Sequence, residues 1–326
     1  MSVQAPVMHV EKTAGAWTFL AYVFLPVMFG IGALGVWLSS RGGDSRLLLL
    51  PLLVLAVCFS FAVERAIPYL ADWNESHEDA GRDAVHALIN ETLLVGSAAA
   101  VPLLTSVFGS HRPWPSHIPF VMQFLIAAAS LDAGITLLHV ASHRVKWLWR
   151  FHAVHHSVRR MYGFNGLMKH PVHQVLETGA GSLPLLALGV PTNVAAAAAF
   201  CVALMLLLQH SNAEYRTGGL HRVLALSKGH RFHHLRWAGV GDVNFGLFTL
   251  AWDRLLGTYS FDAKKRFTTA DIGIDKWPSY PSDYLGQLVV PFMGRRGEAL
   301  VAATHEAAPL GMENIAAGAG LSGLRP

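Results

Sequence analysis

The segment IPFVMQFLIAAASLDAGITLLHVASH, from Ile118 to His143, joins a long apolar run to a pair of histidines. Its first part, Ile118–Leu138, is long enough to cross the roughly 30 Å hydrocarbon core of a bilayer as a helix that rises about 1.5 Å per residue. His139 and His143 follow directly, and their spacing of four residues puts them on one face of that helix. The segment therefore predicts a membrane helix that presents two imidazoles where it leaves the apolar region.

Three further apolar runs indicate a multi-pass membrane protein. Trp17–Leu38 contains 22 residues without a charged side chain, and its terminal tryptophans suit the two bilayer interfaces. We favour a retained helix over a cleaved signal peptide here, because no clear small-residue cleavage site follows. Leu47–Val63 and Thr92–Gly109 are runs of the same kind. Together with Ile118–Leu138 they predict four transmembrane helices.

The composition of the chain agrees with a membrane protein and excludes several other classes. Of its 326 residues, 52% are hydrophobic and 14% are charged, and the mean hydropathy is +0.38. Soluble domains typically carry about a quarter of charged residues. A net charge of +4 is too small to indicate a nucleic-acid partner. Cys58 and Cys201 both lie in apolar runs, so a cysteine-based metal or redox centre is excluded.

Two basic stretches fix the predicted orientation. One follows Leu138 and the other follows Gln209, and the positive-inside rule places both in the cytoplasm. The hydrophobic region 175–209 between them, broken by Pro184 and Pro191, should then cross the membrane an even number of times. It forms either a helical hairpin that crosses or a buried, re-entrant pair, and the sequence does not choose between these.

The chain has 18 histidines, and many of them fall in three short clusters with helical spacing. The clusters are His139-Val-Ala-Ser-His143, His152-Ala-Val-His155-His156 and His230-Arg-Phe-His233-His234. Residues three or four apart share a helix face, with β-carbons about 5 to 6 Å apart, so their imidazoles can bind one metal ion. An adjacent histidine points about 100° away, towards a neighbouring helix or a second ion.

Eight clustered histidines are more than one metal ion can use, and their nitrogen ligands suit iron, zinc, copper or nickel better than magnesium or calcium. Two better-known metal sites are not indicated. A ferritin-like carboxylate site needs Glu-x-x-His pairs, and a zincin needs His-Glu-x-x-His, and the chain contains neither pattern.

The clusters and the motifs around them resemble the fatty acid hydroxylase/sterol desaturase superfamily of integral-membrane di-iron enzymes. Besides the clusters, the resemblance rests on Asp132-x6-His139, Trp149-Arg150-Phe151-His152, His170-Pro171, His210-Ser211-Asn212, Asn244-Phe245-Gly246 and Trp252-Asp253-Arg254. It covers roughly residues 125–260. The chain departs from the family where His173 stands in place of a frequent acidic residue.

The resemblance implies an all-α integral membrane fold, with about four transmembrane helices plus a helical hairpin. A cytosolic helical layer would hold a histidine-rich dinuclear metal site. Residues 1–117 would form the N-terminal transmembrane helices and residues 118–260 the catalytic domain. Residues 261–326 would form a cytosolic tail, and we expect the last two dozen residues to be flexible.

The resemblance also implies roles for individual residues. The eight clustered histidines would bind two iron ions, with His210 as a ninth ligand and His173 as a further one. Asp132 lies two helical turns before His139 in an apolar run, and we expect it to accept the second N–H of a ligand imidazole. A hydrogen bond to another helix is the alternative for Asp132. Asn244 either hydrogen-bonds the site or shapes a turn.

The implied activity is O2-dependent hydroxylation of a lipid such as a fatty acyl chain, a sterol or an aminolipid like ornithine lipid. Desaturation of a lipid or sterol C–C bond at the same site is the first alternative. The chain lacks nucleotide, haem and iron–sulfur motifs, so we expect a separate ferredoxin, rubredoxin or cytochrome b5-like electron donor with its reductase. A non-enzymatic metal transporter or sensor is the second alternative. The clusters follow or lie outside the apolar runs, which favours a catalytic site on the cytoplasmic face.

Overall fold

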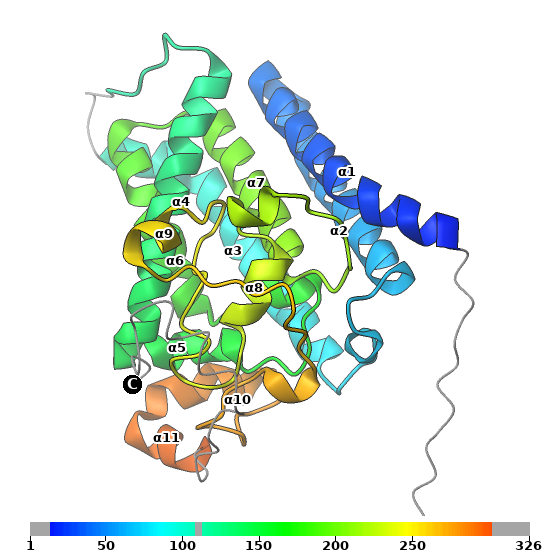
Figure 1. Ribbon diagram of the computed structural model, residues 1–326. Coiled ribbons are helices and arrows are strands. Elements are labelled where there is room, and N and C mark those ends of the chain that lie inside the picture. The colour runs from blue at the N-terminus through cyan, green and yellow to red at the C-terminus, as the bar shows by residue number, and fades with distance from the viewer. Residues whose placement is uncertain (1–13, 108–112, 302–326) are drawn as a thin grey trace, which may run out of the picture.

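The computed structural model describes residues 14–107 and 113–301, and this part of the chain is helical (Figure 1). Six long helices run between two ends of the molecule. They are α1 (Ala14–Arg41), α2 (Leu49–Ala66), α3 (Ala80–Val107), α4 (Phe120–Arg144), α6 (Pro171–Leu188) and α7 (Thr192–His210). The described residues form isolated β-bridges but no strand, which confirms the all-α prediction. The predicted flexible end falls largely on residues 302–326, outside the described part.

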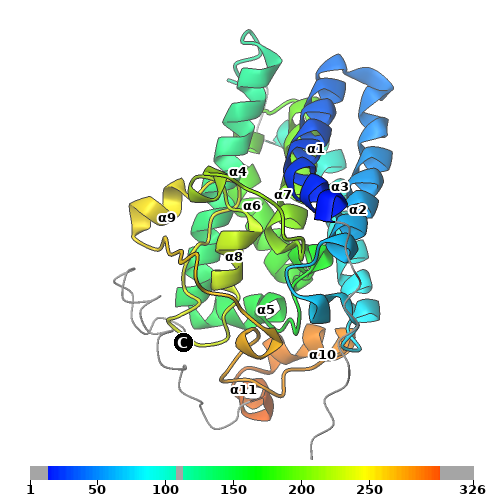
Figure 2. The same ribbon diagram turned by 45° about the vertical axis from the view of Figure 1, so that its right-hand side comes forward.

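Shorter helices cover one end of this bundle. They are α5 (Lys146–His156), α8 (Ser227–His233), α9 (Ala251–Leu256), α10 (Tyr284–Val289) and α11 (Arg295–Val301), with 3-10 turns at Gly43–Leu48, Ala71–Asn74, Gly163–Leu167, Leu220–Arg222, Thr269–Asp271 and Val290–Met293. In both views α5, α10 and α11 lie below the long helices, and α8 lies just above α5 (Figure 1, Figure 2). We call α5, α8, α10 and α11 the short-helix layer. The α1–α2 and α6–α7 connections lie towards the opposite end.

Among the described residues, four helices are long and apolar enough to cross a membrane, which agrees with the predicted number. They are Gly15–Arg41, Gly43–Ala66, Phe120–Arg144 and Thr192–His210. The first three contain predicted runs, whereas the fourth is α7, from the second half of region 175–209. The run Thr92–Gly109 is not among the four, and its last two residues lie outside the described part. It belongs to α3, which begins earlier, in polar sequence, at Ala80.

The region 175–209 forms the predicted hairpin, from α6 and α7. Helix α6 starts with Pro171 in its first turn, where a missing N–H costs nothing, and the His170 side chain accepts a hydrogen bond from the Val172 N–H. It ends at Gly189, whose left-handed φ of 75° suits a residue without a β-carbon. Helix α7 then returns through the centre of the bundle, where it packs against α1, α2, α3 and α4.

Helices α4 and α6 touch backbone to backbone. A β-carbon on Gly134 of α4 would overlap the backbone of Ala180, and one on Gly181 of α6 would press on Leu131. The Ser130 hydroxyl also donates to the Gly181 carbonyl oxygen, at 2.9 Å. This close crossing brings the histidine-bearing end of α4 next to the first turns of α6.

Candidate metal centre

Nine buried histidines meet where the long helices reach the short-helix layer. Helix α4 supplies two, α5 three, α7 one, and α8 with the residue after it three. They are the eight clustered histidines predicted from the sequence together with His210. Helix α8 has seven residues and cannot be stable alone, so packing around the centre must hold its histidines in place.

The nine histidines divide into two groups. The first contains His139, His143, His152, His156 and His233, and the second contains His155, His210, His230 and His234. In each group the nitrogens that could bind a metal all lie within 4.8 Å of one another. The Nε2 atoms of His139 and His233 are 2.9 Å apart, and those of His210 and His230 are 3.0 Å apart. Neighbouring His155 and His156 enter different groups, as their divergence on a helix predicts.

The Nδ1 atoms of several of these imidazoles point away from the group centres, and hydrogen bonds fix them in that orientation. Four donate to backbone carbonyl oxygens: His139 to Phe245 (3.0 Å), His155 to Met168 (3.1 Å), His210 to Leu206 (3.0 Å) and His233 to Val243 (2.9 Å). A carbonyl oxygen only accepts, so Nδ1 carries the proton in each of the four. Their Nε2 atoms therefore direct bare lone pairs towards the other imidazoles.

Burial keeps the imidazoles of the short-helix layer uncharged. It holds the pKa of His152, His156 and His233 well below 6.5, and the neighbouring imidazoles lower these pKa values further. Lone pairs that face one another at about 3 Å repel unless a cation lies between them. Neutral, converging nitrogens are what a metal ion needs, so the two groups fit a metal site.

Asp242 is a residue of the candidate centre that was not predicted from the sequence. Its Oδ1 accepts the His143 Nδ1–H at 2.8 Å, and its Oδ2 accepts the Gly239 N–H at 2.8 Å. A carboxylate behind an imidazole fixes the tautomer and raises the basicity of the metal-facing nitrogen. The signal for it was weak, a single acidic residue in the short, otherwise uncharged stretch Val240–Val243.

The predicted contact between Asp132 and an imidazole is wrong. Asp132 instead accepts hydrogen bonds from the Phe248 N–H (2.7 Å) and from the Thr249 N–H (3.2 Å) and hydroxyl (2.6 Å). It therefore anchors the loop that follows Phe245, the residue whose carbonyl receives the His139 proton. Asp132 and His139 share a face of α4, as their spacing predicts. The carboxylate, however, is occupied by hydrogen bonds from the Phe248–Thr249 loop.

Asn244 shapes the backbone next to the centre. Its φ is 56°, in the left-handed region that Asn tolerates better than most residues. Its amide donates to the carbonyl oxygens of Gly229 (2.9 Å) and Ser260 (2.7 Å) and accepts from the Ser260 N–H (3.0 Å). Of its two predicted roles, the structure supports the turn, and the catalytic assignment of Asn244 is not supported by these contacts.

His173 lies beside the first group without joining it. Its Nε2 is 2.9 Å from the Ser142 hydroxyl, and its Nδ1 is 3.6 Å from Glu177 Oε1. His152, His173 and Glu177 form a third set of closely spaced ligand atoms. Glu177 also binds the Lys169 ammonium, with both side chains buried. The sequence analysis missed this pair, although a Lys and a Glu flanking His170-Pro171 were a visible signal.

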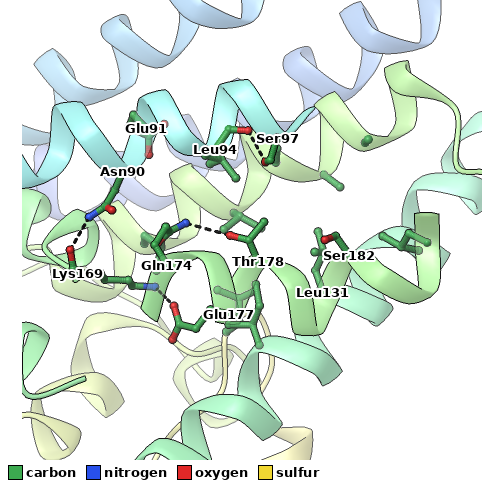
Figure 3. Close-up of a pocket in the computed structure, with 18 of the residues that line it drawn as sticks. Asn90, Glu91, Leu94, Ser97, Leu131, Lys169, Gln174, Glu177, Thr178 and Ser182 are labelled. Atoms are coloured by element: carbon green, nitrogen blue, oxygen red, sulfur yellow. Dashed lines mark hydrogen bonds and ion pairs between the residues drawn. The ribbon is translucent and has the colours of Figure 1, made fainter. Parts of the chain in front are cut away.

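A small cavity adjoins both groups and opens a route to them. Its lining includes His139, His152, His155, His210 and His230. Ile135, Leu206 and Leu247 line it too, together with the Lys169–Glu177 pair. These five residues also line a larger pocket between α3, α6 and α7 (Figure 3), so the two spaces adjoin. An apolar molecule in the larger pocket can thus approach the imidazoles.

Known proteins resemble the chain over this centre. A model of the fatty acid hydroxylase family matches residues 124–258. An ornithine lipid hydroxylase of Rhizobium tropici is 28% identical over 298 residues, which cover 88% of each chain. An alkylglycerol monooxygenase of Danio rerio is 29% identical over 153 residues, or 47% of this chain and 33% of the relative.

A sphinganine C4-monooxygenase of Arabidopsis thaliana is 26% identical over 147 residues, or 44% of this chain and 56% of the relative. No solved structure matches the chain significantly. The family match includes all nine histidines of the two groups, and the relatives are lipid hydroxylases and monooxygenases. The chain therefore contains a fatty acid hydroxylase domain over residues 124–258, and it is an integral-membrane oxidoreductase similar to these lipid hydroxylases and monooxygenases.

Proposed function

We propose that this protein hydroxylates a membrane lipid at a dinuclear iron centre on the cytoplasmic face. The main support for the proposal is that nine buried imidazoles form two groups whose rings lie in contact. The rings of His156 and His234, one from each group, have centroids 4.8 Å apart. Two ions side by side suit such an arrangement, and the all-nitrogen ligand set suits iron.

The histidines of the first group would hold one iron ion and those of the second group the other. Iron bound there would supply the activation of O2 needed to oxidise an unactivated C–H bond, with electrons from an external donor. The chain itself keeps the imidazoles neutral and oriented, through the Phe245, Met168 and Val243 carbonyls and Asp242. Its apolar lining at Ile135, Leu206 and Leu247 excludes water and positions the substrate chain.

The substrate we propose is a membrane lipid of the kind named in its relatives, with an ornithine-type aminolipid favoured. The Rhizobium tropici relative supports this choice, because its similarity extends over 88% of both chains. Electrons would come from a ferredoxin, rubredoxin or cytochrome b5-like protein with its reductase. Such a donor would dock from the cytoplasm, where the positive-inside rule puts the basic stretches beside the centre.

The test combines metal analysis with lipid mass spectrometry. The purified protein should hold two iron ions per chain, and membranes that contain it should gain a lipid with one added oxygen, labelled when the O2 is isotopically labelled. His155→Ala should abolish the product while the protein still inserts, and His77→Ala, at a partly exposed histidine outside both groups, should not. One ion per chain would contradict the dinuclear site. A lipid that loses two hydrogens would indicate a desaturase, and no lipid change under aeration would favour a transporter or sensor.

A further inference from the structure

The larger pocket has one polar end and one apolar end (Figure 3). Leu185, Val190 and Ala198 are among the residues that line the apolar end. The polar end contains side chains from α3 and from the start of α6, namely Asn90, Glu91, Lys169, Gln174, Glu177 and Thr178. The cavity has a volume of about 100 Å³ and continues into an open mouth. This polarity suits a lipid whose head group occupies the polar end and whose chain leaves through the mouth.

The charges at the polar end do not balance. Among the described residues that line the pocket, two are acidic, Glu91 and Glu177, and one is basic, Lys169. The Lys169 ammonium is 2.5 Å from Glu177 Oε2, and both side chains are buried. Lys169 also attracts Glu91, but Glu177 already holds it at contact distance. Glu91 is therefore left without a countercharge of its own, in a partly buried position where a bound cation would stabilise its ionised form.

A second, independent observation points to a ligand at the same place. The Asn90 side chain is 2% exposed, and its amide nitrogen donates to the carbonyl oxygens of Leu167 (2.7 Å) and Lys169 (2.9 Å). These two bonds fix which way the amide faces, since a carbonyl cannot donate. Its buried Oδ1 then has no hydrogen-bond partner among the described residues. A buried acceptor that lines a pocket calls for a donor from the bound molecule.

We propose that Glu91 and Asn90 bind a cationic hydrogen-bond donor, a primary ammonium in the head group of the lipid. An ammonium has three N–H donors and no acceptor, so it can satisfy the Glu91 carboxylate and Asn90 Oδ1 together. Gln174 adds an acceptor, because its amide N–H donates to the Thr178 hydroxyl at 3.1 Å and leaves Oε1 free for a donor. The inference rests on the proposed function, in which this pocket delivers the lipid to the metal centre.

The position of the bound ammonium also predicts which part of the lipid lies near the metal centre. The residues common to the pocket and to the histidine-lined cavity include Lys169 and Glu177, which belong to the polar end. An ammonium at Glu91 keeps the head-group end of the lipid near the imidazoles, with the acyl chain extending towards Val190. Head groups that carry a phosphate or carboxylate and no ammonium are disfavoured, since they would face two carboxylates across one neutralised lysine.

The test measures binding without turnover, in protein reconstituted in phosphatidylcholine nanodiscs without a reductant. The probes are hexadecylamine, hexadecanol and hexadecanoic acid, which share a chain and differ in the polar group. Wild-type protein should bind the amine about ten- to a hundredfold more tightly than the alcohol, as expected for one charge-assisted contact. Glu91→Gln should remove most of that preference, and Glu91→Asp, which keeps the charge, should retain part of it.

Glu75→Gln is the matched control, because Glu75 is exposed and does not line the pocket. Metal content equal to that of wild type shows that each variant keeps its fold. Equal affinity of Glu91→Gln and wild type for the amine would overturn the proposal. So would wild-type protein that binds the acid or the alcohol as tightly as the amine, a comparison that needs no variant. Loss of lipid oxygenation with the amine preference intact would instead reject the proposed function and leave the ammonium site standing.

Discussion

At the scale of single residues, the centre depends on groups that orient imidazoles rather than on the imidazoles alone. Backbone carbonyls accept the Nδ1 protons of His139, His155 and His233, and a carboxylate accepts that of His143. The carboxylate differs from the carbonyls because its charge makes the metal-facing nitrogen more basic. Apart from the nine histidines themselves, Asp242 is therefore the residue whose substitution should lower the metal affinity most directly.

Asp242→Asn should weaken metal binding about ten- to a hundredfold, because the amide keeps the shape but removes the charge behind His143. The measurement is competition for iron against a chelator of known affinity. Asp44→Asn, at an exposed position between α1 and α2, should leave the affinity unchanged. Equal affinities for Asp242→Asn and wild type would show that the 2.8 Å contact contributes nothing to metal binding.

At the scale of elements, the crossing of α4 and α6 positions two of the nine histidines against the polar residues of α6. Gly134 and Gly181 let the two helices approach until backbone meets backbone. Helix α4 carries His139 and His143, and the first turns of α6 carry His173 and Glu177. Any group larger than hydrogen at the crossing must separate these two helices.

Gly134→Ala should lower the free energy of unfolding by about 1–3 kcal/mol through overpacking, and it should also lower the metal content of the purified protein. Denaturant unfolding and metal analysis measure the two effects. Gly179→Ala is the matched control, since no atom lies within 4 Å of a β-carbon there. That control should be neutral or slightly stabilising, because alanine favours a helix. A tolerated Gly134→Ala would refute the tight crossing.

The short helices α5 and α8 should make the metal-free protein sensitive to acid. In the folded chain, burial holds the pKa of His152, His155 and His230 well below 6.5, so these imidazoles gain protons on unfolding. The free energy of unfolding should be nearly independent of pH above about 7 and should fall as pH drops below about 6.5. Unfolding of chelator-treated protein across this range tests the sign, and a stability that rises on acidification would contradict it.

At the scale of the whole molecule, the centre and most basic residues lie at the same end. The α1–α2 connection at the other end holds Arg46, and Arg41 ends α1 there. Basic side chains at the short-helix layer and its connecting loops are more numerous: Lys146, Arg150, Arg159, Arg160, Lys169, Arg216, Arg222, Lys228, Arg231 and Arg236. The positive-inside rule therefore predicts that the metal centre faces the cytoplasm.

Cysteine labelling tests this orientation. In a background with Cys58→Ala and Cys201→Ala, a membrane-impermeant maleimide applied from the cytoplasmic side should react with Lys264→Cys, which is exposed in the loop after α9. The same reagent should not reach Asp44→Cys, which it should label only from the opposite side. Both variants start from exposed residues, so accessibility of the side chain is matched. The reverse pattern would place the centre outside the cytoplasm.

The sequence by itself determined three of the four membrane spans and the eight clustered histidines, and its family resemblance implied the all-α fold class and His210. The spans and the clusters follow from hydropathy and from helical spacing, which depend on neighbours along the chain. The spacing even predicted that His155 and His156 diverge. The boundaries at residues 117 and 260 remain predictions of the same kind.

Only the tertiary structure decided how the histidines divide into two groups, and which residues accept the protons on their other ring nitrogens. His155 joins His210 and His230, from helices far away in sequence, and Asp242 rather than Asp132 receives an imidazole proton. Such partners depend on how helices cross and where loops return, which the local pattern of residues does not encode. The glycine crossing of α4 and α6 and the buried Lys169–Glu177 pair are results of that packing, and they shape the pocket that leads to the metal centre.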